Sequence, residues 1–589
     1  MFGKIIDIDG NNVIIENALH KLEANYVNYH LVFPESDRLI VGEIISMNLD
    51  TIKVFLIGEI RNNKFIANVF KQPNFNTKPR IIYKSEVELL LGSQDIDDYN
   101  NLLIGKSVIY DNYKITTNIS DFFSNHFAIL GNTGSGKSCG VARILQNIFM
   151  HQNNSMPVNA HMVLFDVYGE YHSALSSINN IPNMAYNYLT TRGREENIIN
   201  IPAYFLEVDD LALLLNIENN NALPILEKTL KLVYIFKGKS NLMLNYKNNI
   251  IASAVLEILS SGRNINQMRE QIIAILSRFN TKDINLETQI IQPGYIRTIR
   301  QCISIDNQGK MNAVQYVIEH LEKYDKLDLS KIEVDKSITY DLNDLYYALE
   351  FALISEGAYK SEKIYDEYNQ LKIRLQQIIN SDKNEYFKVS ETRISKEEYV
   401  KRLFSNDGKK IQIVNINLNY VDDRFAKVLT KIYAKIFYDY TVNLPVRCSY
   451  PIHIVLEEAH RYVQKDTDID VLGYNIFERI TKEGRKYGVI LGLITQRPSD
   501  LSSTVLSQCS NFIVFRMFHP DDLKIITSIT NSVGTDSIEK VKSLSNGCSL
   551  CFGVAFKVPL VAKLELPNPM PKSTSLNVKD GWFLPIKND

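Results

Sequence analysis

Eight consecutive residues of this chain have the types and the spacing of a loop that binds nucleotide phosphates. They are Gly131-Asn-Thr-Gly-Ser-Gly-Lys-Ser138, which fit the pattern G-x-x-x-x-G-K-[ST]. In this pattern backbone N–H groups surround the phosphates, the lysine reaches the β- and γ-phosphates, and the hydroxyl binds Mg²⁺. The sequence therefore predicts a site for a nucleoside triphosphate and Mg²⁺, formed by the loop and the residue after it: Gly131, Asn132, Thr133, Gly134, Ser135, Gly136, Lys137, Ser138 and Cys139.

The residues on either side of this loop predict the elements that position it. His126-Phe-Ala-Ile-Leu130 is a short apolar run typical of a buried strand. Residues 139–149 have their apolar side chains at helical spacing. A helix N-terminus adds free N–H groups and a dipole, and both favour negative charge. Strand, loop and helix together predict an anion site.

A second set of candidate residues consists of acids at the ends of apolar runs. Asp166 ends one such run, with Glu170 shortly after it, and Glu457 and Glu458 end another that begins at Ile452. The carboxyl ends of strands in an α/β sheet face the ligand crevice. We expect Glu457 to hold Mg²⁺ through water and Glu458 to polarise the attacking water. Asp166 and Glu170 are predicted to position metal or water, with a simple strand-end turn as the alternative.

A third predicted strand, residues 489–494, has polar groups at both ends. Gln496 follows its tip, where an amide can sense the γ-phosphate. Arg485 precedes it, so it is poorly placed for the chain's own nucleotide and could reach that of a neighbouring subunit. Arginine in trans stabilises charge on the transferred phosphoryl group. A solvated helix face explains this basic stretch equally well, and Arg497 and Arg479 are the second choices.

The composition limits the kinds of partner. Sixty-five basic and 67 acidic residues leave the 589-residue chain almost neutral, so any DNA contact must be local, such as the lining of a channel. Hydrophobic residues make up 45% and charged residues 22%, as in ordinary globular proteins. Six scattered cysteines give no disulfide framework, and the lone Cys548-Ser-Leu-Cys551 favours buried core over metal. With no apolar signal core and no run of membrane-spanning length, we expect a cytoplasmic protein without membrane contact.

Changes of pattern along the chain predict its domains. The first 105 residues contain short strands between polar turns, which favour a small barrel or sandwich. Amphipathic helices follow later in an insertion without visible chemistry: 209–215, 222–234, 250–259, 346–353 and 368–379. We expect an α/β nucleotide-binding core in two parts, with these divisions: 1–105 β-domain, 106–195 first part of the core, 196–407 helical insertion, 408–560 second part of the core, 561–589 C-terminal tail.

The assembled motifs resemble the HerA family of hexameric DNA translocases, in the HerA/FtsK branch of RecA-like ATPases. The residues that carry the resemblance stand in the family's order: 126–138, 166–171, 455–460, 484–488 and 495–501. It implies a RecA-like core, a HerA-type N-terminal β-barrel, and a homo-hexameric ring with ATP at each subunit boundary and double-stranded DNA through the pore. Tyr168 stands where the family often has His, so no role for that His is carried over.

The resemblance also implies partners and a setting. Family members work with an effector such as a nuclease or a sirtuin-like NADase, and we favour bacterial anti-phage defence, with DNA end processing as the other setting. Basic residues near the motifs are candidates for salt-sensitive contacts with DNA phosphates, or else plain solvated charges: Arg192, Arg194, Arg461 and Lys465. The prediction is an ATP-driven DNA motor. The alternative is an ATP-gated ring scaffold that regulates an effector; a secretion or conjugation motor is disfavoured by the missing membrane anchor.

Overall fold

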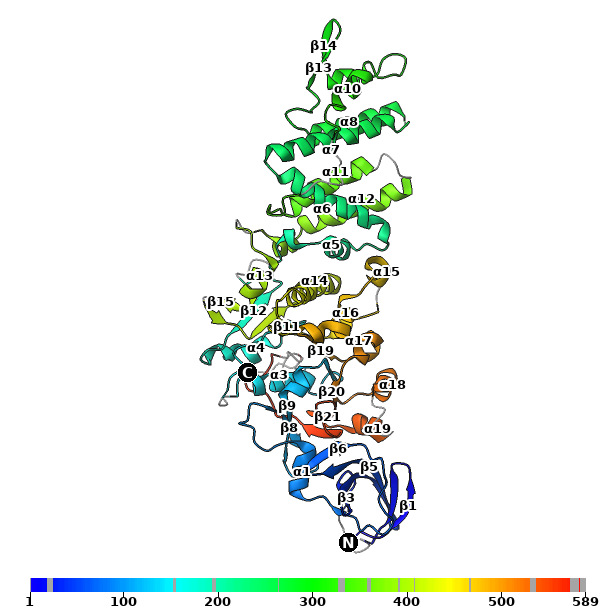
Figure 1. Cartoon of the computed structure of the whole chain (residues 1–589), viewed down its shortest axis with the longest axis vertical. Helices are drawn as coiled ribbons and strands as arrows, with labels where there is room; N and C mark the ends of the chain where they lie inside the picture. The colour runs from blue at the N-terminus through cyan, green and yellow to red at the C-terminus, as the bar shows by residue number, and fades with distance from the viewer. Residues whose placement is uncertain are drawn as a thin grey trace, which may run out of the picture. The chain divides into compact units, whose positions relative to one another are not determined.

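The computed structural model describes most of the chain, in two compact units (Figure 1). The described residues are 2–18, 25–151, 155–192, 197–262, 264–326, 334–356, 362–389, 392–406, 408–465, 468–529, 536–572 and 582. The first unit comprises Met1–Thr191, Glu397–Asp466 and Asn475–Asp589, and the second comprises Arg192–Lys396 and Thr467–Tyr474.

The N-terminal strands form an antiparallel sheet of seven strands, in the order β1-β2-β5-β4-β3-β7 with β6 paired to β5. Buried and more exposed residues largely alternate along β5, because one face of the sheet covers a core that includes Val13, Ile15 and Val54. No ladder joins β1 to β7 among the described residues, so a closed barrel is not confirmed. The elements are β1 (Ile5–Asp9), β2 (Asn12–Glu16), β3 (His30–Pro34), β4 (Leu39–Met47), β5 (Thr51–Arg61), β6 (Lys64–Ala67), β7 (Arg80–Ile81) and helix α1 (Lys84–Leu91).

The main sheet has eleven strands in the order β12-β17-β11-β18-β19-β10-β20-β21-β22-β8-β9. Neighbours from β12 to β20 are parallel, and the remaining neighbours are antiparallel. The central parallel strands are almost wholly buried, as expected for strands covered on both faces. The α/β prediction is confirmed. The strands are β8 (Asn101–Ser107), β9 (Lys114–Asn118), β10 (Phe127–Leu130), β11 (Met162–Asp166), β12 (Tyr186–Thr190), β17 (Ile413–Asn417), β18 (Ile452–Leu456), β19 (Val489–Thr495), β20 (Asn511–Phe515), β21 (Cys548–Gly553) and β22 (Leu560–Lys563).

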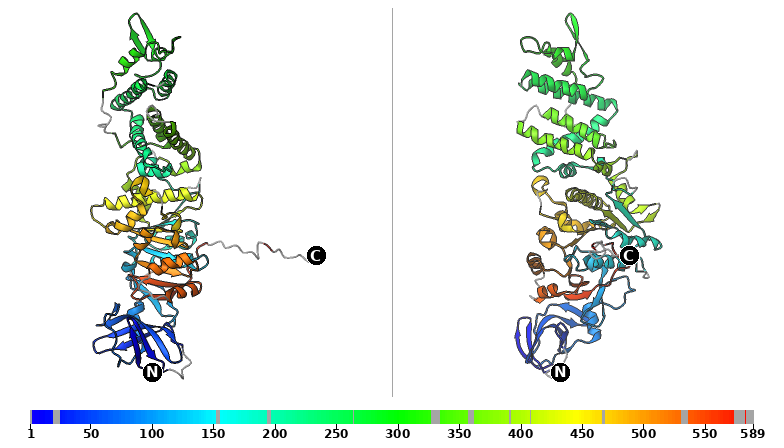
Figure 2. Two further views of the ribbon diagram at one scale, coloured as in Figure 1. Left: turned by 90° about the vertical axis from the view of Figure 1, so that its right-hand side faces the viewer. Right: turned by 180° about the vertical axis from the view of Figure 1, so that it is seen from behind.

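Helices pack against this sheet (Figures 1 and 2). α3 packs against β8 and β10, while α14 and α16 pack against β19. Strands β10 and β19 pair closely because Gly492 lies opposite Phe127, where a Cβ would stand 2.3 Å from the phenyl ring. The helices of this unit include α2 (Ile119–Phe123), α3 (Lys137–Phe149), α4 (His172–Leu175), α14 (Asp423–Val442), α16 (Ile476–Glu483), α17 (Ser503–Ser507), α18 (Pro520–Ile529) and α19 (Asp536–Ser543).

The second unit is mainly helical. The five helices expected there correspond to α5 (Val208–Leu214), α6 (Leu223–Lys237), α7 (Asn241–Ser260), α11 (Leu342–Glu356) and α12 (Glu362–Ile379). α7 begins nine residues and α12 six residues before the expected start, and the other ends differ by at most four residues. Further elements were not expected from the sequence: α8 (Ile265–Arg278), α9 (Ile299–Cys302), α10 (Val314–Leu321), α15 (Asp468–Leu472) and the hairpin β13 (Gln289–Gln292)–β14 (Tyr295–Thr298). The expected helices are present, and the same unit also contains the hairpin β13–β14.

The C-terminal part of the chain adds a strand and a segment beside α3. Strand β22 follows β21 in the chain and pairs with β21 and β8. Beyond β22, Gln146 of α3 donates to the Pro569 carbonyl at 2.8 Å, and the Lys572 N–H donates to the Glu170 carbonyl at 2.9 Å. Cys548 and Cys551 are buried in β21, as expected for core residues. Within the described residues, no helix is both long and apolar enough to span a membrane.

Candidate active site

The glycine loop connects the end of β10 to the start of α3, and its glycines are required by its shape. A Cβ at Gly131 would lie 2.6 Å from the Phe515 Cβ. Gly134 and Gly136 have φ of 73° and 98°, in the left-handed region that other residues rarely adopt. The loop is anchored to the strands beside β10, because the Gly131 N–H donates to the Thr495 carbonyl at 3.2 Å and the Asn132 N–H to the Arg516 carbonyl at 3.0 Å.

The loop fits a phosphate group. Helix α3 begins at Lys137, and its N-cap, Gly136, has no side chain to cap the first N–H groups. Uncapped N–H groups and the positive end of the helix dipole attract an anion. No atom stands within 4 Å of a Cβ built on Gly134, so the turn of the loop faces open space. These features suit the phosphates of a nucleotide.

Glu458 lies against the lysine of the loop. Its Oε1 is 3.5 Å from Lys137 Nζ, and both side chains are buried. Glu458 comes two residues after β18 and has a φ of 46°, a left-handed conformation that costs energy in a residue with a side chain. Burial raises the pKa of Glu458, but contact with His460 and the charge of Lys137 outweigh burial and bring the pKa below its usual value. The carboxylate is therefore ionised at neutral pH.

Glu457 and Asp166 form a second, fully buried acidic pair. Glu457 Oε2 accepts a hydrogen bond from the Val167 N–H at 3.0 Å. Burial first, and then the neighbouring Asp166, raise the pKa of Glu457 well above its usual value. The two oxygens of Asp166 accept from the N–H groups of Glu170 at 3.1 Å and Tyr171 at 2.9 Å. Asp166 thus stabilises the turn after β11. This is the arrangement expected if Asp166 forms a simple turn at the end of the strand, the alternative to a role in binding metal or water.

The residues that could hold Mg²⁺ gather at this edge of the sheet. Within the described residues, no three His, Cys, Asp or Glu side chains form a metal-binding group by themselves. Glu170 is half-buried, and burial raises its pKa although the Ser138 hydroxyl is hydrogen-bonded to it. Ser138, Glu457, Asp166 and Glu170 therefore supply oxygen donors of the kind Mg²⁺ uses, and Mg²⁺ usually completes its shell with phosphate oxygens and water.

The tip of β19 contacts both the loop and the acid. Thr133 Oγ1 of the loop donates to Gln496 Oε1 at 2.5 Å. Thr495 Oγ1 lies 2.9 Å from His460 Nδ1, and that nitrogen lies 3.2 Å from Glu458 Oε2. The sequence indicated Gln496 as a sensor. It assigned no role to His460, although its position two residues after the acid was an available signal.

Known proteins resemble this chain over most of its length. The family model "Helicase HerA, central domain" matches residues 102–301. The "DNA double-strand break repair helicase HerA" of Pyrococcus furiosus is 24% identical over 529 residues, which cover 89% of this chain and 79% of that protein. The protein of the same name from Sulfolobus acidocaldarius is 22% identical over 556 residues, covering 93% and 85%. The chain is similar to the HerA family over most of its length. The predicted family resemblance is confirmed, and this chain is an ATP-hydrolysing enzyme.

Solved structures also resemble this chain. VirB4 of Thermoanaerobacter pseudethanolicus is 14% identical with a TM-score of 0.41, covering 80% of this chain and 97% of that one. Plasmid coupling protein TrwB, in complex with the ATP analogue ADPNP, is 10% identical with a TM-score of 0.41, covering 84% and 95%. Because both TM-scores are low, no functional conclusion rests on them.

The arginines proposed to reach a neighbour's nucleotide, Arg485, Arg479 and Arg497, lie before and after strand β19. Arg485 is exposed in the 3₁₀ turn Gly484–Tyr487 before β19, and the seven residues of β19 span about 20 Å, so it does not reach this chain's own loop. Burial, and also the charge of Arg485, lower the pKa of His126 to about 4, which places Arg485 beside the start of β10. Arg479 pairs with Glu483 at 2.9 Å, whereas Arg497 is exposed next to Gln496.

Three of the four candidate DNA-binding residues belong to the described part of the chain. Arg461 pairs with Asp423 at 2.9 Å and donates to the Tyr168 hydroxyl at 2.9 Å. Lys465 is exposed in the segment that follows. Arg192 belongs to the second unit, and Arg194 lies outside the described residues.

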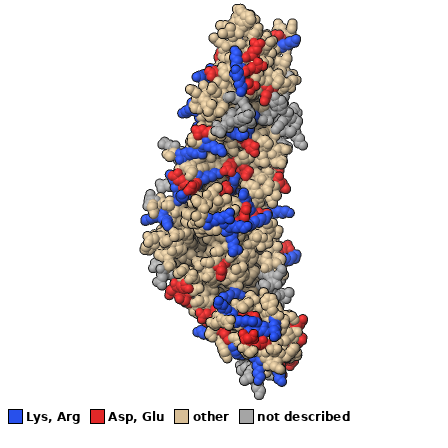
Figure 3. Space-filling view, in the orientation of Figure 1, with Lys and Arg blue, Asp and Glu red and all other residues tan. Residues whose placement is uncertain are grey.

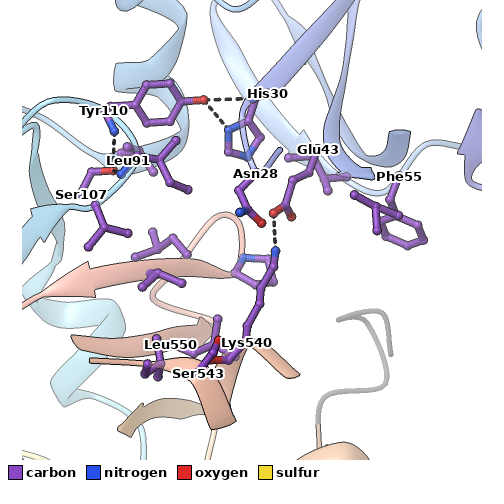
Figure 4. Close-up of a pocket in the computed structure, with 18 residues that line it drawn as sticks. Asn28, His30, Glu43, Phe55, Leu91, Ser107, Tyr110, Lys540, Ser543 and Leu550 are labelled. Atoms are coloured by element: carbon purple, nitrogen blue, oxygen red, sulfur yellow. Dashed lines mark hydrogen bonds and ion pairs between the residues drawn. The ribbon is translucent and has the colours of Figure 1, made fainter. Parts of the chain in front are cut away.

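A cavity of about 230 Å³ lies elsewhere in the first unit, between the N-terminal sheet and strands β21 and β22 (Figure 4). Figure 4 shows His30 beside Tyr110, with His30 Nδ1 2.6 Å from the hydroxyl, and Glu43 ion-paired with Lys540. Burial is the main cause of a lowered pKa of His30, so its ring is neutral. None of the predicted site residues lines this cavity.

Proposed function

We propose that this chain is an ATP-driven motor that moves double-stranded DNA through a ring of six identical subunits. The observation that carries the proposal is the contact between Lys137 of the phosphate loop and the ionised, buried Glu458. A ring that bound ATP only to hold its subunits together would have no need of a water-activating acid next to the loop. Similarity to the relatives supports motion along DNA, because they are named as DNA double-strand break repair helicases.

The roles within one subunit follow from the residues at this edge. The N–H groups of residues 131–139 hold the phosphates, and Lys137 offsets the charge on the β- and γ-phosphates. Ser138 and Glu457, with Asp166, would hold Mg²⁺, and the ion would supply further charge neutralisation. Glu458 takes a proton from the attacking water. Gln496 reports through Thr133 whether the γ-phosphate is present.

The position of Arg485 supports the proposed ring. An arginine at the opposite edge of the sheet cannot stabilise its own subunit's nucleotide, but it can reach the nucleotide of the next subunit. Arg479 and Arg497 are the second choices. The HerA-type barrel, proposed for the N-terminal sheet, belongs to the same ring model.

DNA contacts in the pore are proposed to be few and directed at phosphates. Figure 3 shows Lys and Arg side chains interspersed with Asp and Glu on the visible face, without one continuous basic surface there. Local contacts are consistent with a nearly neutral chain. Lys465, Arg461, Arg192 and Arg194 are the candidates, and salt is expected to weaken their binding.

We propose further that the ring works in the cytoplasm with an effector protein, such as a nuclease or a sirtuin-like NADase, in anti-phage defence or DNA end processing. The alternative is an ATP-gated ring scaffold in which DNA movement is secondary. The two functions differ in what stimulates ATP turnover.

The test is ATP turnover of the purified chain with and without linear duplex DNA, beside Lys137→Ala and Glu458→Gln. The motor predicts turnover that DNA stimulates and that both substitutions abolish. Turnover that ignores DNA but responds to a co-encoded effector would favour the scaffold. Absence of turnover under every condition would overturn the motor for this chain.

A further inference from the structure

A series of four side-chain contacts runs from Lys137 at one end of the phosphate loop, through Glu458, to Thr133 near the other end. One link in the series is the peptide bond between Thr495 and Gln496. Lys137 Nζ lies 3.5 Å from Glu458 Oε1, and Glu458 Oε2 lies 3.2 Å from His460 Nδ1. His460 Nδ1 lies 2.9 Å from the Thr495 hydroxyl oxygen. The next residue, Gln496, accepts a 2.5 Å hydrogen bond from Thr133, which returns the series to the loop.

His460 is the central member of this series because one of its nitrogens touches two partners. The Thr495 hydroxyl oxygen accepts a hydrogen bond from the Arg497 N–H at 3.0 Å, and it also faces the imidazole. The nearby carboxylate favours a proton on Nδ1. This N–H is then hydrogen-bonded to the Thr495 hydroxyl oxygen and lies close to the Glu458 carboxylate without being well aligned with it. The ring is largely buried, with 12% of its side chain exposed, and it follows Glu458 within a single 3₁₀ turn, Ala459–Arg461.

The same geometry leaves the acid available for catalysis. Glu458 Oε2 accepts no well-aligned hydrogen bond from the described residues, so a lone pair remains for a water proton. Electrostatic contact with Lys137 and His460 therefore fixes where the carboxylate lies without occupying it. The strained φ of 46° at Glu458 makes such external support necessary.

We propose that His460 is a positioning residue for ATP hydrolysis: through Nδ1 it holds the Glu458 carboxylate and couples it to the sensor end of β19. This inference rests on the proposed ATP turnover at the same site. A γ-phosphate bound by Lys137 and Gln496 competes with the contact of Lys137 to Glu458 and with the contact of Gln496 to Thr133. His460 then remains the contact that keeps Glu458 in place while Lys137 turns to the phosphate.

The test uses substitutions that separate the two nitrogens of the ring. In His460→Asn the amide stands where Nδ1 stood, and in His460→Gln it stands where Nε2 stood. We expect kcat to fall about 10- to 100-fold in His460→Ala and His460→Gln, as for a misplaced catalytic group. His460→Asn should recover most of the loss, with KM for ATP within about threefold of wild type in all three. His151→Asn, at a half-exposed histidine far along the chain from the site, is the matched control.

Thr495→Val removes the hydroxyl and keeps the branched shape that β19 requires. If His460 acts through Thr495, the loss in kcat in the double variant His460→Ala/Thr495→Val is no greater than in His460→Ala alone. The coupling would be overturned if the kcat losses of His460→Ala and Thr495→Val multiplied fully in the double variant. Equal kcat values for His460→Asn and His460→Gln would also overturn it.

The outcomes separate this inference from the motor itself. Turnover that is indifferent to DNA but depends on His460 in the Asn-over-Gln order would support the positioning role and contradict the motor. DNA-stimulated turnover with a normal kcat in His460→Ala would support the motor and overturn the positioning role. A wild-type chain that hydrolyses no ATP would overturn both.

Discussion

The two edges of the main sheet differ in how their charged side chains are paired. At the carboxyl edge, Lys137, Glu457 and Glu458 are buried and contact one another or the turns around them. At the amino edge, Arg485 is exposed in a turn that packs on β19 through other residues. The residues at the carboxyl edge are preassembled within one chain, whereas the exposed Arg485 at the other edge takes no part in that assembly. The fold therefore builds one half of the proposed site, and we propose that a neighbouring subunit supplies the other half.

The most severe test of this comparison is Arg485→Ala. We expect ATP turnover to fall about 1,000-fold, the lower end for an arginine acting in trans. Mixing Arg485→Ala with Lys137→Ala subunits should restore part of the turnover, because each supplies what the other lacks. Lys482→Ala, an exposed neighbour that pairs with Glu478 at 3.3 Å, is the control. Failure of the mixture to regain activity would mean that the amino edge does not serve a neighbour.

The carboxyl edge is tested by Glu458→Gln. Losing the water-activating acid should lower kcat about 100- to 1,000-fold. Nucleotide binding should persist, because Lys137 is freed from its ion pair. A fluorescent ATP analogue measures binding beside a phosphate-release assay. Loss of binding equal to that in Lys137→Ala would show that Glu458 supports the fold of the loop rather than catalysis.

The pH dependence of stability tests how tightly His126 is packed at the amino edge of the sheet. His126 Nδ1 accepts from the Leu491 N–H at 2.9 Å, and the pKa of His126 is lowered to about 4 from 6.5, mainly by burial. The unfolded chain binds this proton more readily, so stability is fully present above the unfolded pKa and decreases as pH falls from 6.5 toward 4. His126→Asn keeps an acceptor without the titration.

The measurement is the thermal unfolding midpoint of the first unit at about pH 7.5 and about pH 5, within the full chain. The decrease between the two should be smaller in His126→Asn than in wild type. An equal decrease in both proteins would assign the acid sensitivity to other groups, such as His161, whose pKa burial also lowers to about 4.

The smallest expected effect lies away from both edges, at the ion pair between Glu43 and Lys540 (Figure 4). The pair is partly exposed and therefore screened, so Glu43→Gln should cost only about 0.5 kcal/mol of unfolding free energy. ATP turnover should stay within about twofold of wild type, because the substitution leaves the nucleotide site intact. The loss of unfolding free energy is also smaller than the amount that changes an equilibrium constant tenfold. A large loss of turnover would reveal that the N-terminal sheet acts on the nucleotide site.

The sequence predicted the parts of the site whose chemistry is local. The loop at 131–138 and the acids at 457 and 458 were identified because residue type and spacing determine a glycine turn and a strand end. The contacts between Thr133 and Gln496, and between His460 and Thr495, join residues 363 and 35 positions apart. They depend on the order β18-β19-β10, which no local pattern specifies.

Other differences have the same cause. Closing the N-terminal sheet into a barrel requires pairing between its first and last strands, a long-range contact that short alternating strands do not determine. β22 was missed because four residues, only two of them fully buried, give a weak pattern. The position of Arg485 at the opposite edge was deducible, because a residue before a parallel strand lies at the edge away from the strand's tip.

The central claim is that ATP hydrolysis at this site moves the chain along DNA. Displacement of a triplex-forming oligonucleotide from linear duplex DNA measures this motion directly. The account predicts displacement with ATP, and none with Glu458→Gln or with a non-hydrolysable ATP analogue. Full DNA-stimulated ATP turnover without displacement would contradict it.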